Sequence, residues 1–309
     1  MEGHARPRRP TPEEIATFLR LEVHHHRPSA PWKILQLLIA GSKDHAFLDR
    51  AWIAPLLGLM PPKLRSRLAI RLLALSPHYW IYQWNNRYGP ALRRGQILDH
   101  EAWRVATSRK AFCEQVLAPH LRWDMTVLDL GTGPGYLAGE LSRRVAKVVA
   151  CDVSRGVIAC ARALNDAANL TYVANAADGL QPIADASIDL AVSIAVFQHL
   201  TPEQSLAMFR ELRRVLRPGG LGLCHLRLED ADDPRQWVIP DTVSWRGRRL
   251  QPRMVHFRAD DLRSALEGLG FTDVALPAVR EVAALEDDVQ GDHLLRFRRP
   301  READGPEAP

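Results

Sequence analysis

The sequence contains little cysteine and no long apolar run. Its four cysteines are scattered through 309 residues without a C-x-x-C pair, which excludes a small domain held together by disulfides. Cys151 and Cys224 lie in apolar, strand-like runs, so we predict buried, reduced thiols. No apolar run reaches the roughly 18 residues that span a bilayer, and residues 1–10 lack the apolar stretch of a signal peptide. These absences favour a cytoplasmic protein.

Lysine is also scarce, so arginine supplies almost all of the positive charge behind the net charge of +5. The basic residues are spread along the chain instead of being gathered with aromatic residues into one patch, so a nucleic-acid partner is not expected. Hydrophobic residues make up 46% of the chain and charged residues 25%, which excludes a disordered or collagen-like protein. The length favours one large domain, or one domain with an appendage.

Residues 1–110 are predicted to form an all-helical segment that acts as a cap or substrate lid. Thr11-Pro12-Glu13-Glu14 combines a threonine N-cap, a proline at the first helical position and a glutamate at N3. Apolar clusters separated by Pro-Pro, Ser-Pro and Gly-Pro pairs continue to about residue 121. His24-His25-His26 does not predict a metal site, since consecutive histidines on a helix diverge by about 100° each. We therefore expect no metal ion.

The pattern changes in residues 111–299, which we predict to be the catalytic domain. Short β-rich runs alternate with helical stretches there, which is typical of βαβ units in a parallel sheet with helices on both faces. Helices are predicted from Thr201 to Leu216, stopped by Pro218-Gly219-Gly220, and from Arg258 to Gly268. The tail 300–309, rich in Pro, Glu, Asp and Ala, is predicted to be disordered. The predicted strands are Thr126–Leu130, Lys147–Cys151, Leu170–Val173, Ile188–Ile194, Leu221–Leu226 and Phe271–Leu276.

The residues that indicate a chemistry follow the first predicted strand. Residues 127–137, VLDLGTGPGYL, form an apolar strand and a glycine-rich turn that opens a helix. Glycines let the backbone turn sharply and let a ligand approach it closely. The next predicted strand leads to Asp152, 21 positions after Gly131, where a carboxylate can hold the two hydroxyls of a ribose. Together these features predict a nucleoside cofactor.

The spacing of the glycines separates two such cofactors. A dinucleotide site needs G-x-G-x-x-G, whose third glycine allows close helix packing beneath a pyrophosphate. This chain reads G-x-G-x-G from Gly131 to Gly135 and has Tyr136 where that third glycine would stand. With Asp129 in front, the stretch resembles the D-x-G-x-G-x-G motif of S-adenosylmethionine-dependent methyltransferases with the Rossmann-like fold.

Later segments extend the resemblance over approximately residues 112–276. ADASIDLAVS at residues 184–193 resembles the family's run into strand four, and VFQHL at 196–200 resembles its continuation. LRPGG at 216–220 is similar to the family's turn before strand five, and LEGLGF at 266–271 to the helix end before strand six. The resemblance implies an α/β fold with a doubly wound, mostly parallel seven-stranded Rossmann-like sheet. It also implies a member of the ubiquinone/menaquinone-biosynthesis-like group of small-molecule methyltransferases.

The resemblance further assigns S-adenosylmethionine contacts to individual positions. Family members often have aspartate at the adenine position, where this chain has Asn175. Asn175 with Ala176, or Asp178 instead, therefore remain alternative adenine contacts. The contacts that the resemblance implies, from the methionine end to the adenine end, are Asp129, Gly131, Thr132, Gly133, Gly135, Asp152, Asn175, Ala176 and Asp178.

The acceptor is expected to be a small molecule with an oxygen, nitrogen or carbon nucleophile. His199 follows the fourth predicted strand and is the candidate general base, because a neutral imidazole at pH 7 can take a proton. The alternative for His199 is packing against the cofactor loop. Tyr82 and Trp84, from a dense aromatic cluster, and His256, from a polar segment, are the candidate acceptor contacts. The sequence fixes neither the acceptor nor the oligomeric state.

Two other functions stay open as alternatives. An NAD(P)-dependent oxidoreductase would use the same glycine turn and Asp152, but Tyr136 and the lack of a Tyr-x-x-x-Lys pair disfavour it. A non-catalytic S-adenosylmethionine-binding or scaffold protein would keep the cofactor site and lose turnover. Such a protein could contact a membrane surface through its N-terminal helices, although no integral insertion is expected.

Overall fold

The computed structural model describes residues 48–73, 94–176, 179–228, 244–245, 248–249, 256–283 and 293–301. The chain divides into two compact units, each described by itself below. One comprises residues 1–106, 154–164 and 230–254, and the other comprises residues 107–153, 165–229 and 255–309. The helix start predicted at Thr11, the histidines at 24–26 and the tail from residue 302 lie outside the described residues.

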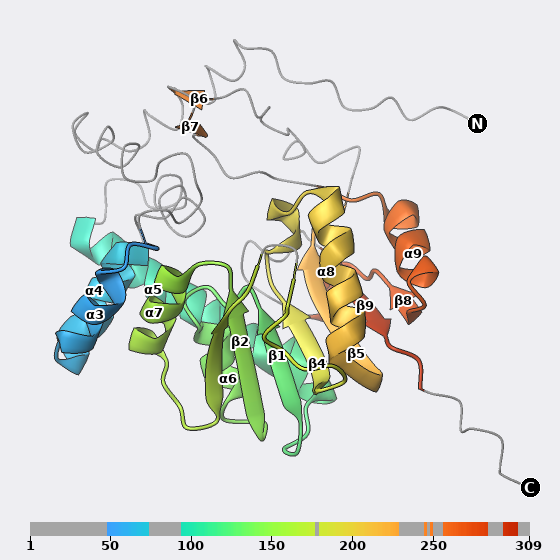
Figure 1. The fold of residues 1–309 in the computed structure, drawn as a ribbon, viewed down its shortest axis with the longest axis horizontal. Helices are drawn as coiled ribbons and strands as arrows, with labels where there is room; N and C mark the ends of the chain where they lie inside the picture. Colours follow the sequence, from blue (N-terminus) through green and yellow to red (C-terminus); the bar gives the residue numbers. More distant parts are fainter. Residues whose placement is uncertain are drawn as a thin grey trace, which may run out of the picture. The chain divides into compact units, whose positions relative to one another are not determined.

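The second unit is built on a seven-stranded sheet with the order β3-β2-β1-β4-β5-β9-β8 (Figure 1). β1 to β5 pair in parallel, whereas β9 runs antiparallel to both β5 and β8. The predicted α/β class and mostly parallel sheet are confirmed, while β9 was not predicted. The strands are β1 (Thr126–Leu130), β2 (Lys147–Asp152), β3 (Leu170–Ala174), β4 (Ile188–Ser193), β5 (Leu216–Leu226), β8 (Thr272–Ala275) and β9 (His293–Arg298).

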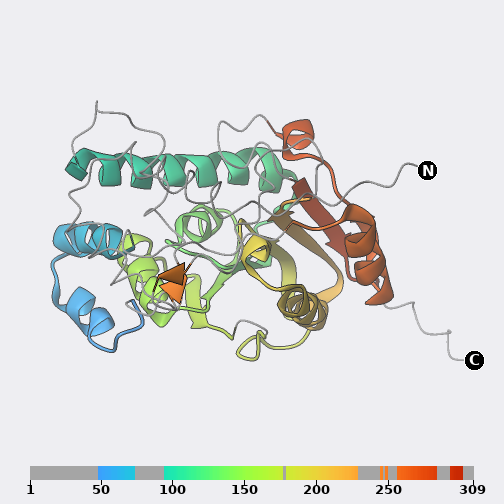
Figure 2. The ribbon, with the colours of Figure 1, turned by 90° about the horizontal axis from the view of Figure 1, so that it is seen from above.

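Helices cover both faces of this sheet. α6 (Tyr136–Leu141) and α8 (Pro202–Val215) lie on opposite faces (Figure 2). On the face of α8, α9 (Ala259–Gly268) joins the same apolar core as the strands. Phe209 of α8 stacks on Phe197 with ring centroids 4.6 Å apart and meets Phe297 of β9 edge-on at 5.9 Å. This core holds α8 against the part of the sheet that contains β5 and β9.

The start of α8 is as predicted, but the turn after it is not. The hydroxyl of Thr201 accepts the N–H of Gln204 at 3.1 Å, and Oε1 of Gln204 accepts the N–H of Thr201 at 2.9 Å, which completes a capping box. The turn predicted at residues 218–220 lies inside β5 instead. Pairing with β4 jumps there from Leu216 to Leu221, and Gly219 has a φ of +78°. The extra residues form a bulge that lets the strand begin five residues early.

Short elements complete the second unit. They are a π-helical turn η1 (Cys113–Leu117), 3-10 turns η2 (Ala118–His120) and η3 (Phe197–His199), and α10 (Val279–Val282). All four cysteines of the chain are buried, which confirms the predicted burial of the thiols. Burial raises the pKa of Cys113 to about 11 and that of Cys160 to about 12, so both stay protonated near neutral pH.

Within the described ranges, no helix is long and apolar enough to cross a membrane.

The first unit contains α3 (Ile53–Leu59), α4 (Pro62–Leu73) and α7 (Arg155–Leu164), with a short hairpin of β6 (Ser244–Trp245) and β7 (Arg248–Arg249). Asp49 accepts the hydroxyl of Ser154 at 2.6 Å and the N–H of Gly156 at 3.0 Å, which tethers α7 to the segment before α3. α5 (Arg94–Phe112) runs across residue 110, so the domain boundary placed there stays a prediction.

Candidate cofactor site

The glycine-rich turn joins β1 to α6 and takes a backbone path that other residues disfavour. Gly131, Gly133 and Gly135 have φ angles of +70°, +54° and +77°. In this left-handed region an L side chain is strained. A Cβ on Gly131 would also collide with the side chain of Val196. The glycines are therefore a geometric requirement of the turn.

The turn is anchored to the neighbouring strand through backbone hydrogen bonds. The N–H groups of Gly131 and Thr132 both donate to the carbonyl of Cys151 at 2.9 Å, and the N–H of Gly135 donates to the carbonyl of Thr132 at 3.0 Å. Cys151 immediately precedes Asp152 in β2. The turn is consequently bonded directly to the end of β2.

Two buried carboxylates flank this turn. Asp129 is 2% exposed, and its Oδ2 accepts the hydroxyl of Thr132 at 2.7 Å. Asp152 is 5% exposed, and its Oδ2 accepts the N–H of Gly133 at 3.2 Å. Burial raises the pKa of Asp129 to about 6; the charge of Asp152 adds to this, while the Thr132 hydrogen bond and the charge of Arg109 oppose it. A cationic ligand placed here would offset the desolvation of both acids.

Asp129 and Asp152 face the same side of the sheet. Asp129 pairs with Ala150 in the β1–β2 register, and Asp152 follows two residues later, on the same face of β2. The chain passes from β1 to β2 and β3 on one side and places β4 and β5 on the other. Ligands of open parallel sheets bind at the carboxyl ends beside such a switch point. The acids therefore mark the ligand edge of the sheet.

The turn after β3 is closed by an asparagine. The N–H of Asn175 donates to the carbonyl of Asp152 at 3.1 Å, and its Nδ2 donates to the carbonyls of Ala176 at 2.6 Å and Gly179 at 3.4 Å. Carbonyl oxygens only accept, so the amide nitrogen must face the turn and Oδ1 must face away from it. Asn175 is thus oriented as a hydrogen-bond acceptor. Asp178 lies outside the described residues.

His225 shares the face of the two acids and was not predicted. Val192 of β4 pairs with both Asp129 and Leu223, and His225 lies two residues beyond Leu223. It is 2% exposed, and its Nδ1 accepts the N–H of Ala195 at 3.2 Å, so the neutral ring carries its proton on Nε2. The period-two alternation along β5 was the signal that could have singled it out.

Residues 127–220 match the family described as a methyltransferase domain. An uncharacterized methyltransferase from Synechocystis sp. is 31% identical over 149 residues, which are 48% of this chain and 67% of that protein. A malonyl-[acyl-carrier protein] O-methyltransferase from Hahella chejuensis is 36% identical over 57% of this chain and 63% of its own length. A biotin biosynthesis bifunctional protein from Cellvibrio japonicus is 36% identical over 30% of this chain, which spans only 18% of that protein.

The chain belongs to the S-adenosylmethionine-dependent methyltransferases. The family that the glycine motif predicted is thereby confirmed. Among solved structures, an S-adenosylmethionine-dependent methyltransferase from Methanosarcina mazei is 19% identical with a TM-score of 0.47, covering 60% of this chain and 98% of that one.

The residues of this methyltransferase fit its cofactor. Asp129 and Asp152 provide buried negative charge, which suits the sulfonium and ammonium groups and the ribose hydroxyls of S-adenosylmethionine. Glycine at position 131 lets the turn pass close to the side chain of Val196, where a Cβ would collide. Asn175 offers an acceptor to the adenine amino group. In the described part of the chain, no cluster of three His, Cys, Asp or Glu side chains could hold a metal ion.

The predicted acceptor residues are only partly described. His199 ends η3, just after β4, with its N–H donating to the carbonyl of Val196 at 2.8 Å. His256 precedes Phe257, whose N–H donates to the carbonyl of Arg227 at 2.9 Å, so His256 lies next to the end of β5. Tyr82 and Trp84 lie outside the described residues. The two histidines are therefore associated with the carboxyl ends of β4 and β5, on the far side of the switch point from Asp152.

Proposed function

We propose that this protein transfers the methyl group of S-adenosylmethionine to a small-molecule acceptor with an oxygen, nitrogen or carbon nucleophile. The observation that carries the proposal is the pair of buried carboxylates at the switch point, Asp129 and Asp152, each hydrogen-bonded to the turn between their strands. When bound, the cofactor supplies an electrophilic methyl group on sulfur. The protein's own residues then need to bind it, orient the acceptor in line and remove a proton.

Asp152 is the proposed ribose ligand. Its carboxylate is held by the N–H of Gly133 and can accept charge-assisted hydrogen bonds from both ribose hydroxyls. Asp129 and Thr132, with the backbone of residues 131–135, are proposed to hold the methionine end. Ionised Asp129 favours a cation near it, because the attraction offsets the cost of keeping a carboxylate buried.

For adenine we favour Asn175 over Asp178. The Asn175 amide nitrogen is engaged by the turn itself, which leaves Oδ1 to accept from the adenine amino group. The backbone N–H of Ala176 can donate to a ring nitrogen. An aspartate at position 175 would have no N–H for the carbonyls of Ala176 and Gly179, so asparagine both closes the turn and presents the acceptor.

The acceptor is proposed to lie on the β4–β5 side. His199 remains the proposed general base, and His225 joins His256 as a proposed acceptor contact on this side. Tyr82 and Trp84 stay proposed acceptor contacts from the sequence alone. We further propose a member of the ubiquinone/menaquinone-biosynthesis-like group, supported by the sequence motifs at 184–200 and 216–220, and no nucleic-acid partner, supported by the spread of the basic residues along the chain. A cytoplasmic location is proposed because its four buried cysteines are free thiols.

A second acceptor class is suggested by the relative from Hahella chejuensis, which is named for methylating malonyl on acyl carrier protein. Its 36% identity covers 186 residues and thus extends beyond the 94-residue family match at 127–220. In that case the nucleophile would be a carboxylate, which needs no general base. Replacement of His199 would then leave turnover unchanged.

The proposal is tested by following transfer of the labelled methyl group of S-adenosylmethionine. The purified protein is incubated with a small-molecule fraction of cell extract, with phenols and quinols, or with malonyl-acyl carrier protein. Label in a small molecule supports the proposal, and label in malonyl-acyl carrier protein supports the second class. Cofactor binding without transfer to any fraction would favour the non-catalytic alternative.

A further inference from the structure

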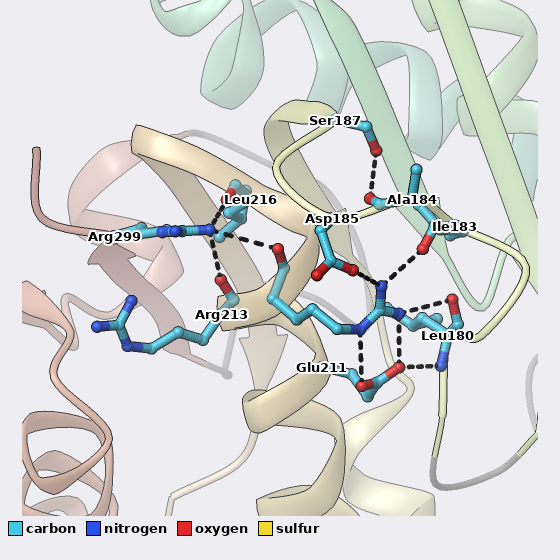
Figure 3. A network of polar contacts seen from close by, with 10 residues as sticks. Leu180, Ile183, Ala184, Asp185, Ser187, Glu211, Arg213, Leu216 and Arg299 are labelled. Carbon is cyan, nitrogen blue, oxygen red and sulfur yellow. Dashed lines mark hydrogen bonds and ion pairs between the residues drawn. The ribbon is translucent and has the colours of Figure 1, made fainter. Parts of the chain in front are cut away.

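The chain between the Asn175 turn and β4 has no regular secondary structure, and two side chains of α8 hold it. Glu211 and Arg214, three residues apart on α8, bond to Leu180, Ile183 and Asp185. Figure 3 labels Glu211 and these three partners. These α8 residues lie about thirty positions away in sequence from the segment they contact. We call Glu211 and Arg214 the α8 clamp.

Arg214 uses its whole guanidinium group in the clamp. Nη2 donates to the carbonyl of Leu180 at 3.0 Å, and Nη1 donates to the carbonyl of Ile183 at 2.8 Å and to Asp185 at 2.6 Å. Nε and Nη2 donate to the two oxygens of Glu211 at 3.0 and 2.8 Å. A planar fork with five donors suits this pattern, whereas a lysine could not reproduce it.

Glu211 holds the same segment through its carboxylate. Its Oε2 accepts the N–H of Leu180 at 2.7 Å, so Leu180 is held through both its N–H and its carbonyl. Leu180 itself is fully buried, and Ile183 is 4% exposed. The hydrogen bonds of Arg214 hold the pKa of Glu211 below its ordinary value, so the pair stays charged at neutral pH.

The carbonyls at the end of α8 are held as well. Arg299 donates from Nη1 to the carbonyls of Arg213 at 3.1 Å and Leu216 at 2.7 Å (Figure 3). The backbone carbonyl of Arg214 accepts the N–H of Ala186 at 2.9 Å. The segment is thus bound at Leu180, where it leaves the turn, and at Ala186, just before β4.

The clamp and the adenine turn share a boundary. Asn175 is fixed to β2 through the carbonyl of Asp152, and Gly179 is fixed to Ala176 at 3.3 Å. The next residue is Leu180, whose N–H and carbonyl both bond to the clamp. The turn therefore runs between one end attached to the sheet and another attached to α8, and movement of Leu180 would be transmitted to the Asn175 amide.

We propose that Glu211 and Arg214 are positioning residues that set the affinity and adenine selectivity of the cofactor site through the turn at Asn175. This inference rests on the proposed function, because it needs the turn to receive adenine. Neither residue is required to touch the cofactor. Their effect is predicted on binding, with little effect on turnover at saturating cofactor.

The test is calorimetric titration of S-adenosylhomocysteine into wild-type protein, Arg214→Gln and Arg214→Lys. Loss of hydrogen bonds from a charged group predicts a dissociation constant about ten-fold higher in Arg214→Gln. The lysine variant restores charge without the fork and is expected to recover only part of that loss. The matched control is Arg143→Gln, since Arg143 bonds Glu140 at 2.6 Å with the same i,i+3 spacing on an exposed surface. The control is expected to bind like the wild type.

S-inosylhomocysteine, which lacks the 6-amino group, separates positioning from general stability. Wild type should prefer S-adenosylhomocysteine, and this preference should shrink in Arg214→Gln if the Asn175 amide has moved. An unchanged affinity and preference in folded Arg214→Gln would overturn the inference while leaving the proposed function intact. If that variant does not fold, the same result in Arg214→Lys decides the matter. Wild type that binds neither ligand would overturn the proposed function, and the inference with it.

Discussion

The turn after β1 and the turn after β3 lie at the same edge of the sheet, but different interactions hold them. The first owes its path to backbone conformation, with positive φ angles at Gly131, Gly133 and Gly135 and hydrogen bonds to β2. The second has backbone hydrogen bonds too, but side chains also hold it, namely Asn175 within the turn and the α8 clamp beyond it. A glycine with a positive φ is strained by any larger side chain, whereas hydrogen bonds from side chains can be removed one at a time.

Gly131→Val should have the largest effect, because it tests the conformational turn directly. The positive φ costs about 1–2 kcal/mol and crowding against Val196 about 1–3 kcal/mol, so we expect a clear fall in melting temperature and no measurable cofactor binding. Adding Val196→Ala should restore the stability lost to crowding, but not the stability lost to the positive φ. Thermal unfolding and titration measure both. A Gly131→Val protein with normal binding would show that this turn is also adaptable.

Asp152→Ala should abolish cofactor binding and leave the fold intact. Each hydrogen bond to a charged group contributes about 1.5–3 kcal/mol, and the ribose is proposed to make two. Circular dichroism and titration with S-adenosylhomocysteine check the two statements. Asp124→Ala is a suitable control, because Asp124 is paired with Arg122 at an exposed position. Undiminished binding by Asp152→Ala would remove it from the site.

The affinity for S-adenosylmethionine should fall as pH drops through about 6. The pKa of Asp129 is raised to about 6, and only the ionised form attracts a cationic ligand, so binding weakens where this carboxyl takes up its proton. Asp129→Asn should flatten this pH dependence while lowering affinity at pH 7. Titrations between pH 5 and 8 measure the slope. The same slope in both proteins would contradict the assignment.

Asn175→Asp should have the smallest effect and sharpens the contrast between the turns. The carboxylate can still accept from the adenine amino group, but it loses the donors to Ala176 and Gly179, each worth about 1 kcal/mol. We expect a loss of several-fold in affinity without a change in melting temperature comparable to that of Gly131→Val. An affinity equal to wild type would favour Asp178 as the adenine contact.

The same contrast explains how much the sequence could predict. β1 to β4 were predicted to within about a residue, because their apolar runs are bounded by clear turn residues. Gly131 to Gly135 were predicted because their conformation demands glycine. β9 was missed because its sequence, HLLRFR from His293 to Arg298, is short and contains two arginines, and so does not stand out as an apolar strand.

Long-range contacts could not be predicted in the same way. His225 reaches the site only through the pairing of β5 with β4, and Arg214 reaches Leu180 only once α8 has packed on the sheet. Nothing local marks Arg214, because its partner is distant in sequence, and the alternation along β5 gives only the face of the strand on which His225 lies. The orientation of the Asn175 amide likewise follows from carbonyls that only the folded turn brings together.

The central claim is that this sheet edge holds S-adenosylmethionine. Parallel calorimetric titrations with S-adenosylmethionine, S-adenosylhomocysteine and NADH test it most directly. We predict saturable binding of the first two, lost in Asp152→Ala, and no binding of NADH. Binding of NADH alone would contradict the account and would favour the alternative of an NAD(P)-dependent oxidoreductase.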